Sequence, residues 1–393
     1  MNVEKKMNLE MMVQTKDLVH ALSFAGSVVE KRNVLQELSN IKLVAKNGIL
    51  EIGATDMDLY LNLEIGAEVT CEGQTTVSSQ ILSDIVRKIP DAKIKISQKA
   101  DSDKIEIIGI SCRFELLTLP ALSFPTMENI DSAVSVTLPS LELVKIIEYT
   151  NFSISTEETR YNLNGIYMHV KNNEFLGAST DGHRLSVAST KLDQKCNDFG
   201  VIVPRKTVIE LLKILKDSKN IQSDIEIFLS STKIKFKCNN LILISKLIDG
   251  VFPEYSSFIP TDNQNKLTVN TKLLASAIDR VATVTVDKFR AVKLFIGNDS
   301  MEITASGEAK GAASEVLNYS TENSSKNSHE KENMCKYEGV EVSIGFNPRY
   351  LSDVLGAINV EEVEILFKDS FSPVLIKTNL SDIDCFVVMP VKV

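Results

Sequence analysis

The sequence predicts an α+β fold made of three similar copies of one strand-and-helix unit. Its first apolar residues alternate as in a short strand and then change to helical spacing. This pattern occurs three times in the same order, at Met11, Val13, Leu18 and Leu22, at Val136, Leu138, Leu143 and Ile147, and at Leu267, Val269, Leu274 and Ile278. The second and third sets follow the first by a constant offset, 125 and 256 positions, which indicates internal duplication.

The elements of each copy follow from local signals. The first copy is expected to have a helix over Thr15–Val29, then alternating strands over Ile41–Val69 with a hairpin turn at Asn47-Gly48. Each copy then has a second predicted helix, over Ser79–Ile89, Arg205–Lys216 and Pro348–Ile358, and proline suits a helix start. Strand-like runs follow these helices at Lys93–Ile96, Ile225–Leu229 and Val363–Phe367. Each copy therefore reads as strand, helix and strands, built twice.

The copies define three expected domains, residues 1–133, 134–260 and 261–393. Phe124-Pro125 closes the first copy and Phe252-Pro253 closes the second, each followed by a short polar link. Residues 321–338 break the pattern because they are polar and poor in apolar side chains. We expect them to be a mobile surface insertion in the third domain.

Composition excludes several classes of protein. The six cysteines contain no C-x-x-C pair and have no clustered histidines nearby, which predicts reduced thiols and no zinc site. No apolar run approaches the ~20 residues of a membrane helix, and the N-terminus lacks the apolar segment of a signal peptide. With no phosphate-binding glycine motif and no carboxylate cluster either, we expect a cytoplasmic protein without membrane contact, metal or cofactor.

The stretch from Ala178 to Leu185 resembles a catalytic cluster because it holds Ser179, Asp181 and His183. On one strand face, alternate side chains lie ~7 Å apart, too far for a hydrogen-bonded relay. No nucleophile-elbow motif accompanies them. We therefore expect Asp181 to organise a turn through Gly182, and no enzyme activity.

Basic residues recur on or beside the predicted helices although the net charge is −9. An acidic balance argues against a compact groove binder, but it does not prevent a local basic surface. Helices that share basic residues can face a polyanion and contact phosphates without reading base sequence. The residues are Lys16, Lys31, Arg32, Arg87, Lys88, Arg205, Lys206, Lys213, Lys216, Arg280, Lys288 and Arg290.

Ordered motifs along nearly the whole chain are similar to those of one family. They are Lys31-Arg32-Asn33, Leu38-Ser39-Asn40, Leu119-Pro120, Phe124-Pro125, Arg160-Tyr161, Leu163-Asn164-Gly165, Thr180 to Leu185, Asp249-Gly250, Phe252-Pro253, Tyr255, Pro260, Lys288-Phe289-Arg290 and Val387-Val388-Met389-Pro390. On these motifs the chain resembles the bacterial β sliding clamps, the processivity subunits of DNA polymerase III. The resemblance implies the DNA clamp fold in three domains, and a head-to-tail homodimeric ring around duplex DNA.

The resemblance also implies partners and sites. The partners would be the replicative polymerase catalytic subunit, the clamp loader complex, translesion polymerases and mismatch-repair proteins. A peptide-docking pocket would comprise Leu163, Thr180, Gly182, His183, Arg184, Leu185, Pro253, Phe258, Asn347, Tyr350, Phe371, Val387, Val388, Met389 and Pro390. Residues near DNA would be Arg32, Arg87, Arg160, Tyr161, Arg205 and Lys206, and the dimer interface would include Phe114, Thr283 and Val284.

Some residues depart from the family pattern. Glu157 is acidic in a DNA-facing loop, Ser257 and Phe371 alter the pocket, and Thr283 is less apolar than expected at a dimer interface. Thr283 and Glu157 leave open a second hypothesis, a peptide-binding adaptor that has lost the ring role. An enzyme that uses Asp181 and His183 is the third.

Overall fold

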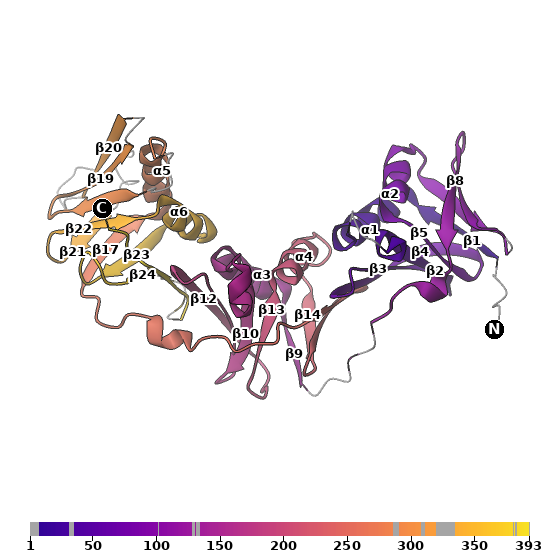
Figure 1. Ribbon diagram of the computed structural model, residues 1–393, viewed down its shortest axis with the longest axis horizontal. Helices are drawn as coiled ribbons and strands as arrows, with labels where there is room; N and C mark the ends of the chain where they lie inside the picture. Colours follow the sequence, from indigo (N-terminus) through magenta and orange to yellow (C-terminus); the bar gives the residue numbers. More distant parts are fainter. Residues whose placement is uncertain are drawn as a thin grey trace. The chain divides into compact units, whose positions relative to one another are not determined.

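The computed structural model describes residues 8–30, 35–100, 102–127, 130, 134–285, 291–307, 311–319, 335–379, 381 and 383–392, without the side chain of Gln36. Contacts divide the chain into two compact units. Unit 1 comprises Met1–Val144 and Lys206–Leu247, and unit 2 comprises Lys145–Arg205 and Ile248–Val393. Figure 1 labels the helices and strands of the two units.

The described strands of unit 1 form one sheet of twelve, in the order β1-β6-β7-β8-β5-β2-β3-β4-β16-β15-β14-β9. Strand β4 also pairs with β1, so the first eight strands of this order close on themselves. The strands are β1 (Leu9–Gln14), β2 (Asn40–Lys46), β3 (Ile49–Thr55), β4 (Leu59–Cys71), β5 (Gly73–Ser78), β6 (Lys93–Gln98), β7 (Lys104–Ile108), β8 (Arg113–Leu119), β9 (Val134–Pro139), β14 (Asp224–Leu229), β15 (Lys233–Cys238) and β16 (Leu241–Lys246). Because β4 pairs with β16, strands of the first and second copies share this sheet.

Helices α1 (Thr15–Val28) and α2 (Ser79–Lys88) pack on each other and against this sheet (Figure 1). Leu18, Leu22 and Ala25 are at most 1% exposed, so the helical spacing read from the sequence marks the buried face of α1. Helix α4 (Arg205–Leu215) belongs to unit 1 from its second residue, and α3 (Ser140–Thr150) crosses from unit 1 into unit 2. Two short 3₁₀ turns, η1 (Gln36–Ser39) and η2 (Ala121–Ser123), complete the unit.

The described strands of unit 2 form two sheets, β13-β10-β11-β12-β25-β24-β23-β17-β21 and β20-β19-β18-β22. They are β10 (Gly165–Lys171), β11 (Glu174–Thr180), β12 (Arg184–Lys191), β13 (Phe199–Pro204), β17 (Asn265–Asn270), β18 (Val292–Ile296), β19 (Ser300–Gly307), β20 (Gly311–Asn318), β21 (Cys335–Glu338), β22 (Val342–Phe346), β23 (Glu362–Phe367), β24 (Val374–Thr378) and β25 (Cys385–Val388). The pairing of β12 with β25 joins strands of the second and third copies.

Helices α5 (Thr271–Ala282) and α6 (Pro348–Ala357) pack together in unit 2, as α1 and α2 do in unit 1 (Figure 1). The side chain of Asn270 caps α5 and that of Asn347 caps α6, each by accepting a backbone N–H. Three 3₁₀ turns, η3 (Asn151–Ser153), η4 (Glu158–Leu163) and η5 (Tyr255–Phe258), lie in the same unit.

The structure confirms the internal repeat. Strands β1, β9 and β17 are six residues each, and helices α1, α3 and α5 follow them at once, at the 125- and 256-residue offsets of the sequence pattern. The predicted hairpin is also confirmed, since Asn47 and Gly48 have φ values of 52° and 76° between β2 and β3.

One prediction is partly wrong. Residues 335–338, placed in the insertion, form β21, which pairs with β17, and Cys335 is 1% exposed. Periodicity could not identify a four-residue strand whose partner lies 66 or more positions away. Residues 321–334 lie outside the described residues. Among the helices that the structure describes, none is long and apolar enough to span a membrane.

Candidate functional site

The stretch from Thr180 to Arg184 forms the turn between β11 and β12. Thr180 Oγ1 donates to the carbonyl of Arg184 (2.6 Å) and accepts from the N–H of Gly182 (3.1 Å). Asp181 Oδ1 accepts from the N–H groups of His183 (2.9 Å) and Arg184 (3.1 Å). Gly182 has a φ of +89°, which favours glycine, and Arg160 Nη1 would lie only 2.7 Å from a Cβ at this position. The predicted turn is confirmed.

These contacts leave no arrangement for catalysis. The Ser179 hydroxyl is fully buried and donates to the carbonyl of Thr150, while Asp181 bonds within the turn and to Arg184. The His183 ring is exposed and stacks against Tyr350 at 6.2 Å between ring centroids. The three side chains therefore have separate partners, as expected for a structural turn.

Arg184 is the most heavily engaged side chain of the turn. Its guanidinium contacts Asp181 (Nε to Oδ2, 3.0 Å) and Asp353 of α6 (Nη1 to Oδ2, 2.7 Å), and it donates to the Phe152 carbonyl. It also lies over the rings of Tyr350 (4.6 Å) and Phe152 (5.4 Å). At 7% side-chain exposure, Arg184 ties the turn to α6 rather than presenting a charge to solvent.

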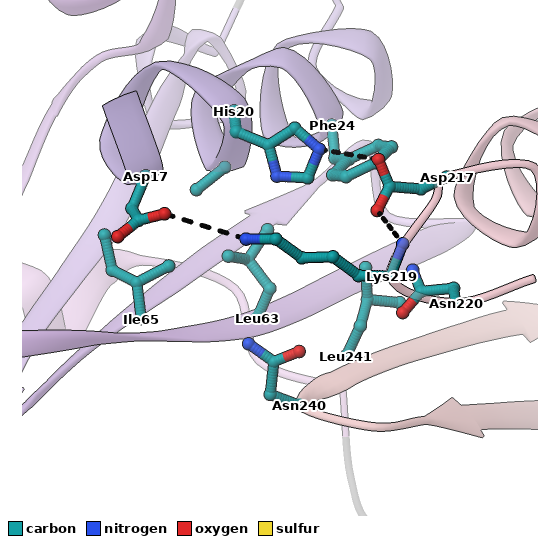
Figure 2. A pocket seen from close by; sticks show the side chains of 11 residues that line it. Asp17, His20, Phe24, Leu63, Ile65, Asp217, Lys219, Asn220, Asn240 and Leu241 are labelled. Carbon is teal, nitrogen blue, oxygen red and sulfur yellow. Dashed lines mark hydrogen bonds and ion pairs between the residues drawn. The ribbon is translucent and has the colours of Figure 1, made fainter. Parts of the chain in front are cut away.

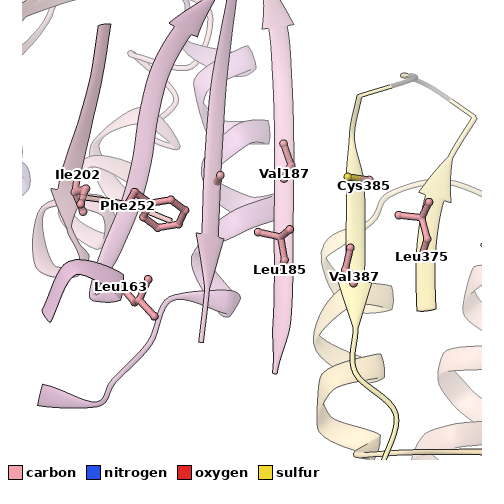
Figure 3. Packing of buried hydrophobic residues seen from close by; sticks show 9 residues of the cluster. Leu163, Leu185, Val187, Ile202, Phe252, Leu375, Cys385 and Val387 are labelled. Carbon is pink, nitrogen blue, oxygen red and sulfur yellow. The ribbon is translucent and has the colours of Figure 1, made fainter. Parts of the chain in front are cut away.

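The end of the chain lies along this turn. Leu185 pairs with Val387 across β12 and β25, and the N–H of Met389 donates to the carbonyl of His183 (2.9 Å). Figure 3 shows Leu185 and Val187 on β12 beside β25, which carries Cys385 and Val387. With Leu163 and Phe252 these residues form one buried apolar cluster. Segments about 200 positions apart in sequence are thereby brought together, as the sequence interpretation required.

Exposed apolar side chains occur on segments next to this cluster. Phe258, Phe371 and Met389 are 59%, 76% and 38% exposed, which is unusual for large apolar groups. Pro253 follows the buried Phe252, and Tyr255 of η5 packs against the cluster. We call the turn 180–184, the side chains of Pro253, Tyr255, Phe258 and Phe371, and the chain end 387–390 the docking surface, after the peptide-docking pocket that the sequence predicts here. Asn347 differs from the other predicted members because its side chain caps α6.

The same turn occurs in the first copy. Thr55 Oγ1 donates to the carbonyl of Leu59 (2.9 Å), Met57 has a φ of +81°, and Asp56 Oδ1 accepts from the N–H groups of Asp58 and Leu59. The N–H of Lys246 donates to the carbonyl of Asp58 (2.9 Å), as that of Met389 does to His183. The backbone arrangement of the docking surface is thus repeated in unit 1.

Charged side chains distinguish the first copy from the second. Asp58 forms an ion pair with Lys246 (2.9 Å), and Asp56 is bonded by Lys206. In the second copy His183 stands in place of Asp58 and Met389 in place of Lys246. Asp181 stands in place of Asp56 and pairs with Arg184 of its own turn. The first turn therefore bears ion pairs at positions where the second has the His183 ring and the Met389 side chain.

A cavity of about 50 Å³ lies between α1 and the loop after α4 in unit 1 (Figure 2). His20 Nε2 lies 2.8 Å from Asp217, and Lys219 Nζ lies 3.6 Å from Asp17. Burial opposes the charged form of Asp217, but the Lys219 N–H and His20 outweigh it and lower the pKa of that carboxyl. The cavity has room for water only, so we assign these contacts to holding α1 in place.

An aromatic stack lies below the docking surface. The His169 ring stacks on Tyr167 (4.6 Å between centroids), which stacks on Phe252 (5.1 Å), and His169 Nε2 lies 3.0 Å from the Tyr255 hydroxyl. Burial lowers the pKa of His169 to about 4 and raises that of Tyr255 to about 12. His169 is therefore neutral near pH 7.

This burial predicts a pH-dependent stability. Because the pKa of His169 is lower in the folded chain than its ordinary 6.5, the unfolded chain binds the extra proton between these pKa values. Stability should fall by roughly 3 kcal/mol as the pH drops from 6.5 to 4. Amide hydrogen exchange of β10, corrected for intrinsic rates, should show this loss, and His169→Phe should remove most of it. His183→Gln, which changes an exposed histidine, is the control and should lose stability at low pH as the parent does. Exchange rates in β10 that are the same at pH 4.5 as at pH 6.5 would contradict the assignment.

The residues predicted to contact DNA have different surroundings. Arg87 lies in the last turn of α2 and Arg205 begins α4, and both are exposed with no ion-pair partner among the residues described. Lys206 donates to Asp56 and to the Val28 carbonyl (3.2 Å), so its ammonium already has oxygen partners. Arg160 pairs with Glu157 (3.2 Å), which gives that unexpected acidic residue a partner, and Tyr161 is 59% exposed. Lys31, Arg32, Lys288 and Arg290 lie outside the described residues.

The predicted dimer-interface residues lie on two separate elements. Phe114 is half-buried on β8, which pairs with β7 along its length and with β5 at only two positions. Thr283 is exposed just after α5, and its hydroxyl donates to the Asp279 carbonyl (3.1 Å). Val284 is half-buried beside it.

Sequence reasoning missed Phe152 and Asp353, which bond to Arg184, and the buried Asp384 beside β25. Asp353 follows Tyr350 by three positions, so both lie on one face of α6, and this spacing could have indicated it. Asp384 directly precedes the apolar run 385–388, where a buried carboxylate is unexpected. Nothing in the local sequence indicates that the Phe152 carbonyl accepts from Arg184.

Three family models match consecutive parts of the chain. They describe the N-terminal, central and C-terminal domains of the DNA polymerase III beta subunit, at residues 9–128, 137–254 and 256–392. The beta sliding clamp of Rickettsia bellii is 55% identical over 98% of this chain and all of the relative. That of Caulobacter vibrioides is 35% identical, with the same coverage of both chains.

Solved structures agree with these matches. A sliding clamp from Bartonella birtlesii, bound to griselimycin, has a TM-score of 0.89 and 34% identity over 98% of this chain and all of its own. The beta sliding clamp of Caulobacter crescentus has a TM-score of 0.88 and 35% identity at the same coverage. The repeated α+β units, the three matched domains and these relatives together show that the chain belongs to the DNA polymerase III beta subunit family, the beta sliding clamps.

Proposed function

We propose that two copies of this chain close into a head-to-tail ring around duplex DNA and tether the replicative polymerase to it. As a family member the chain is a non-catalytic processivity subunit, and its fold is the three-domain clamp fold. We propose domain boundaries near residues 133 and 260. Phe114 on β8 and Thr283 with Val284 after α5 would then lie at the contact between subunits.

The second part of the proposal concerns docking. Polymerases, the clamp loader, translesion polymerases and mismatch-repair proteins would bind by short peptides laid on the docking surface. The supporting observation is the contact of the turn 180–184 with the chain end, in which the Met389 N–H donates to the His183 carbonyl and the Met389 side chain is exposed. Such a surface combines apolar contact with a few polar markers, as peptide recognition requires.

A defined probe exists for this surface. Sliding clamps from Bartonella birtlesii and Pseudomonas aeruginosa have been solved bound to griselimycin. We propose that griselimycin binds the docking surface of this chain as well. It can therefore report on the site whatever the natural peptides are.

The DNA contacts would come from exposed basic side chains on the helices. Arg87 and Arg205 support this part best, because each is exposed and no ion pair neutralises it in the described structure. Lys206 and Arg160 differ, since they are paired with Asp56 and Glu157. Contacts of this kind are independent of base sequence, which suits a ring that slides. We propose a cytoplasmic location.

Retention on DNA tests the ring. After loading by a clamp loader, the protein should remain on nicked circular DNA through a gel-filtration column and should be lost from the same DNA once it is cut to a linear form. The physical reason is that a closed ring leaves only over a free end. Equal loss from both forms would overturn the ring, and with monomeric sedimentation at micromolar concentration would favour an adaptor without one.

A further inference from the structure

The docking surface depends on a very short strand. β25 has four residues, Cys385–Val388, and pairs with β12 on one side and β24 on the other. It places Val387 in the apolar cluster and leads directly into Met389. A strand of this length has few backbone hydrogen bonds with which to hold its register.

Register matters here because the two faces of β25 carry different side chains. Cys385 and Val387 face the cluster beneath the docking surface (Figure 3). Phe386 lies on the opposite face, where its ring is 5.6 Å from that of Tyr149 and 6.2 Å from that of Phe152. A shift by one residue would exchange the faces and turn Phe386 toward the cluster.

The Asp384 carboxylate continues the pairing of β25 beyond its first residue. Val187 pairs with Cys385, and two positions further along β12 the N–H of Ser189 donates to Asp384 Oδ1 (2.8 Å). The Ser189 hydroxyl is 3.4 Å from the same oxygen. The side chain thus supplies the acceptor that a further strand residue would otherwise provide.

The second oxygen of this carboxylate meets a cation. Asp384 Oδ2 lies 2.6 Å from Lys145 Nζ of α3, and Lys145 is also 5.6 Å from the ring centroid of Tyr149. The Asp384 side chain is 0% exposed, so the ammonium of Lys145 is its counter-charge. A fully buried carboxylate is destabilising unless it is paired, so both partners should be needed together.

We propose that Asp384, paired with Lys145, is a register latch that positions β25 for peptide docking. The carboxylate joins the strand to Ser189 of β12 and to Lys145 of α3. The Tyr149 ring of α3 packs against the Phe386 ring of the same strand. The latch rests on the proposed docking function. Its effect is on ligand affinity through the position of Val387 and Met389, without direct contact with the ligand.

The test compares single and double substitutions with griselimycin as the probe. Lys145→Met leaves the buried Asp384 carboxylate without its cation, and Asp384→Asn leaves the half-buried Lys145 ammonium without its counter-charge. Each should weaken griselimycin binding at least tenfold in calorimetry. Asp384→Asn with Lys145→Met removes both charges while the amide oxygen can still accept from Ser189, and it should bind within threefold of the parent. Lys237→Met, which breaks an exposed pair with Glu226 in unit 1, is the matched control and should change nothing.

Amide exchange separates positioning from unfolding. In the single variants, faster exchange should be confined to β25 and its neighbours, with β10 unchanged. Parent-like affinity in both single variants would overturn the latch, as would a folded double variant that binds as weakly as the singles. If the parent itself does not bind griselimycin, the docking proposal fails instead, so the two failures are distinguishable.

Discussion

Deletion of Met389–Val393 is expected to weaken griselimycin binding more than a hundredfold while leaving the proposed dimer intact. The deletion removes the 38%-exposed Met389 side chain and two backbone contacts, Met389 N–H to the His183 carbonyl and Val391 N–H to the Gly345 carbonyl, both 2.9 Å. Strand β25 ends at Val388, so its pairing with β12 and β24 is retained. The docking surface therefore loses Met389 and Pro390 but keeps the strand pairing of β25. Calorimetry would measure the affinity, and sedimentation the dimer.

The matched control for the deletion is Lys392→Ala, which alters an exposed side chain and keeps the backbone. It should bind griselimycin as the parent does. If the deleted chain binds griselimycin as tightly as the parent, the chain end after Val388 is not part of the docking surface. If the deleted chain is monomeric, the tail contributes to the ring instead.

Arg184→Met is expected to destabilise unit 2 by about 3–5 kcal/mol, because it removes a buried cation that pairs with two partly buried carboxylates. Arg184 is 7% exposed and pairs with Asp181 and Asp353, whose side chains are 18% and 29% exposed. The substitution also removes the contacts with the Tyr350 and Phe152 rings. Amide exchange of α6 and β12, or urea denaturation followed within unit 2, would measure the loss.

Arg349→Met is the control for Arg184. Arg349 also approaches Asp353, at 3.8 Å, but its side chain is 77% exposed. Solvent screens such a pair, so the expected loss is below ~1 kcal/mol. Adding Asp353→Asn to Arg184→Met should recover part of the stability by removing one unmatched charge. Equal effects of the two arginine substitutions would contradict the role assigned to Arg184.

The repeated architecture could be predicted from the sequence because it follows from the local spacing of apolar residues. The change from alternating to helical spacing at Val13–Leu18 marks the place where β1 passes into α1, and the same pattern marks α3 and α5. Thr180, Asp181 and Gly182 likewise specify their turn through contacts at most four positions apart. Local chemistry also explained why Asp181 and His183 form no relay.

Only the tertiary structure decided which distant charges meet. Arg184 meets Asp353, 169 positions away, and Asp384 meets Ser189 and Lys145 across β12 and α3. The two copies of the turn look alike in sequence, yet Lys206 and Lys246 pair with the first, whereas the chain end at Met389 lies along the second. Periodicity reports which face of an element is apolar, but it carries no information on which distant side chain lies opposite that face. That pairing depends on strand register and on the packing of helices far apart in the chain.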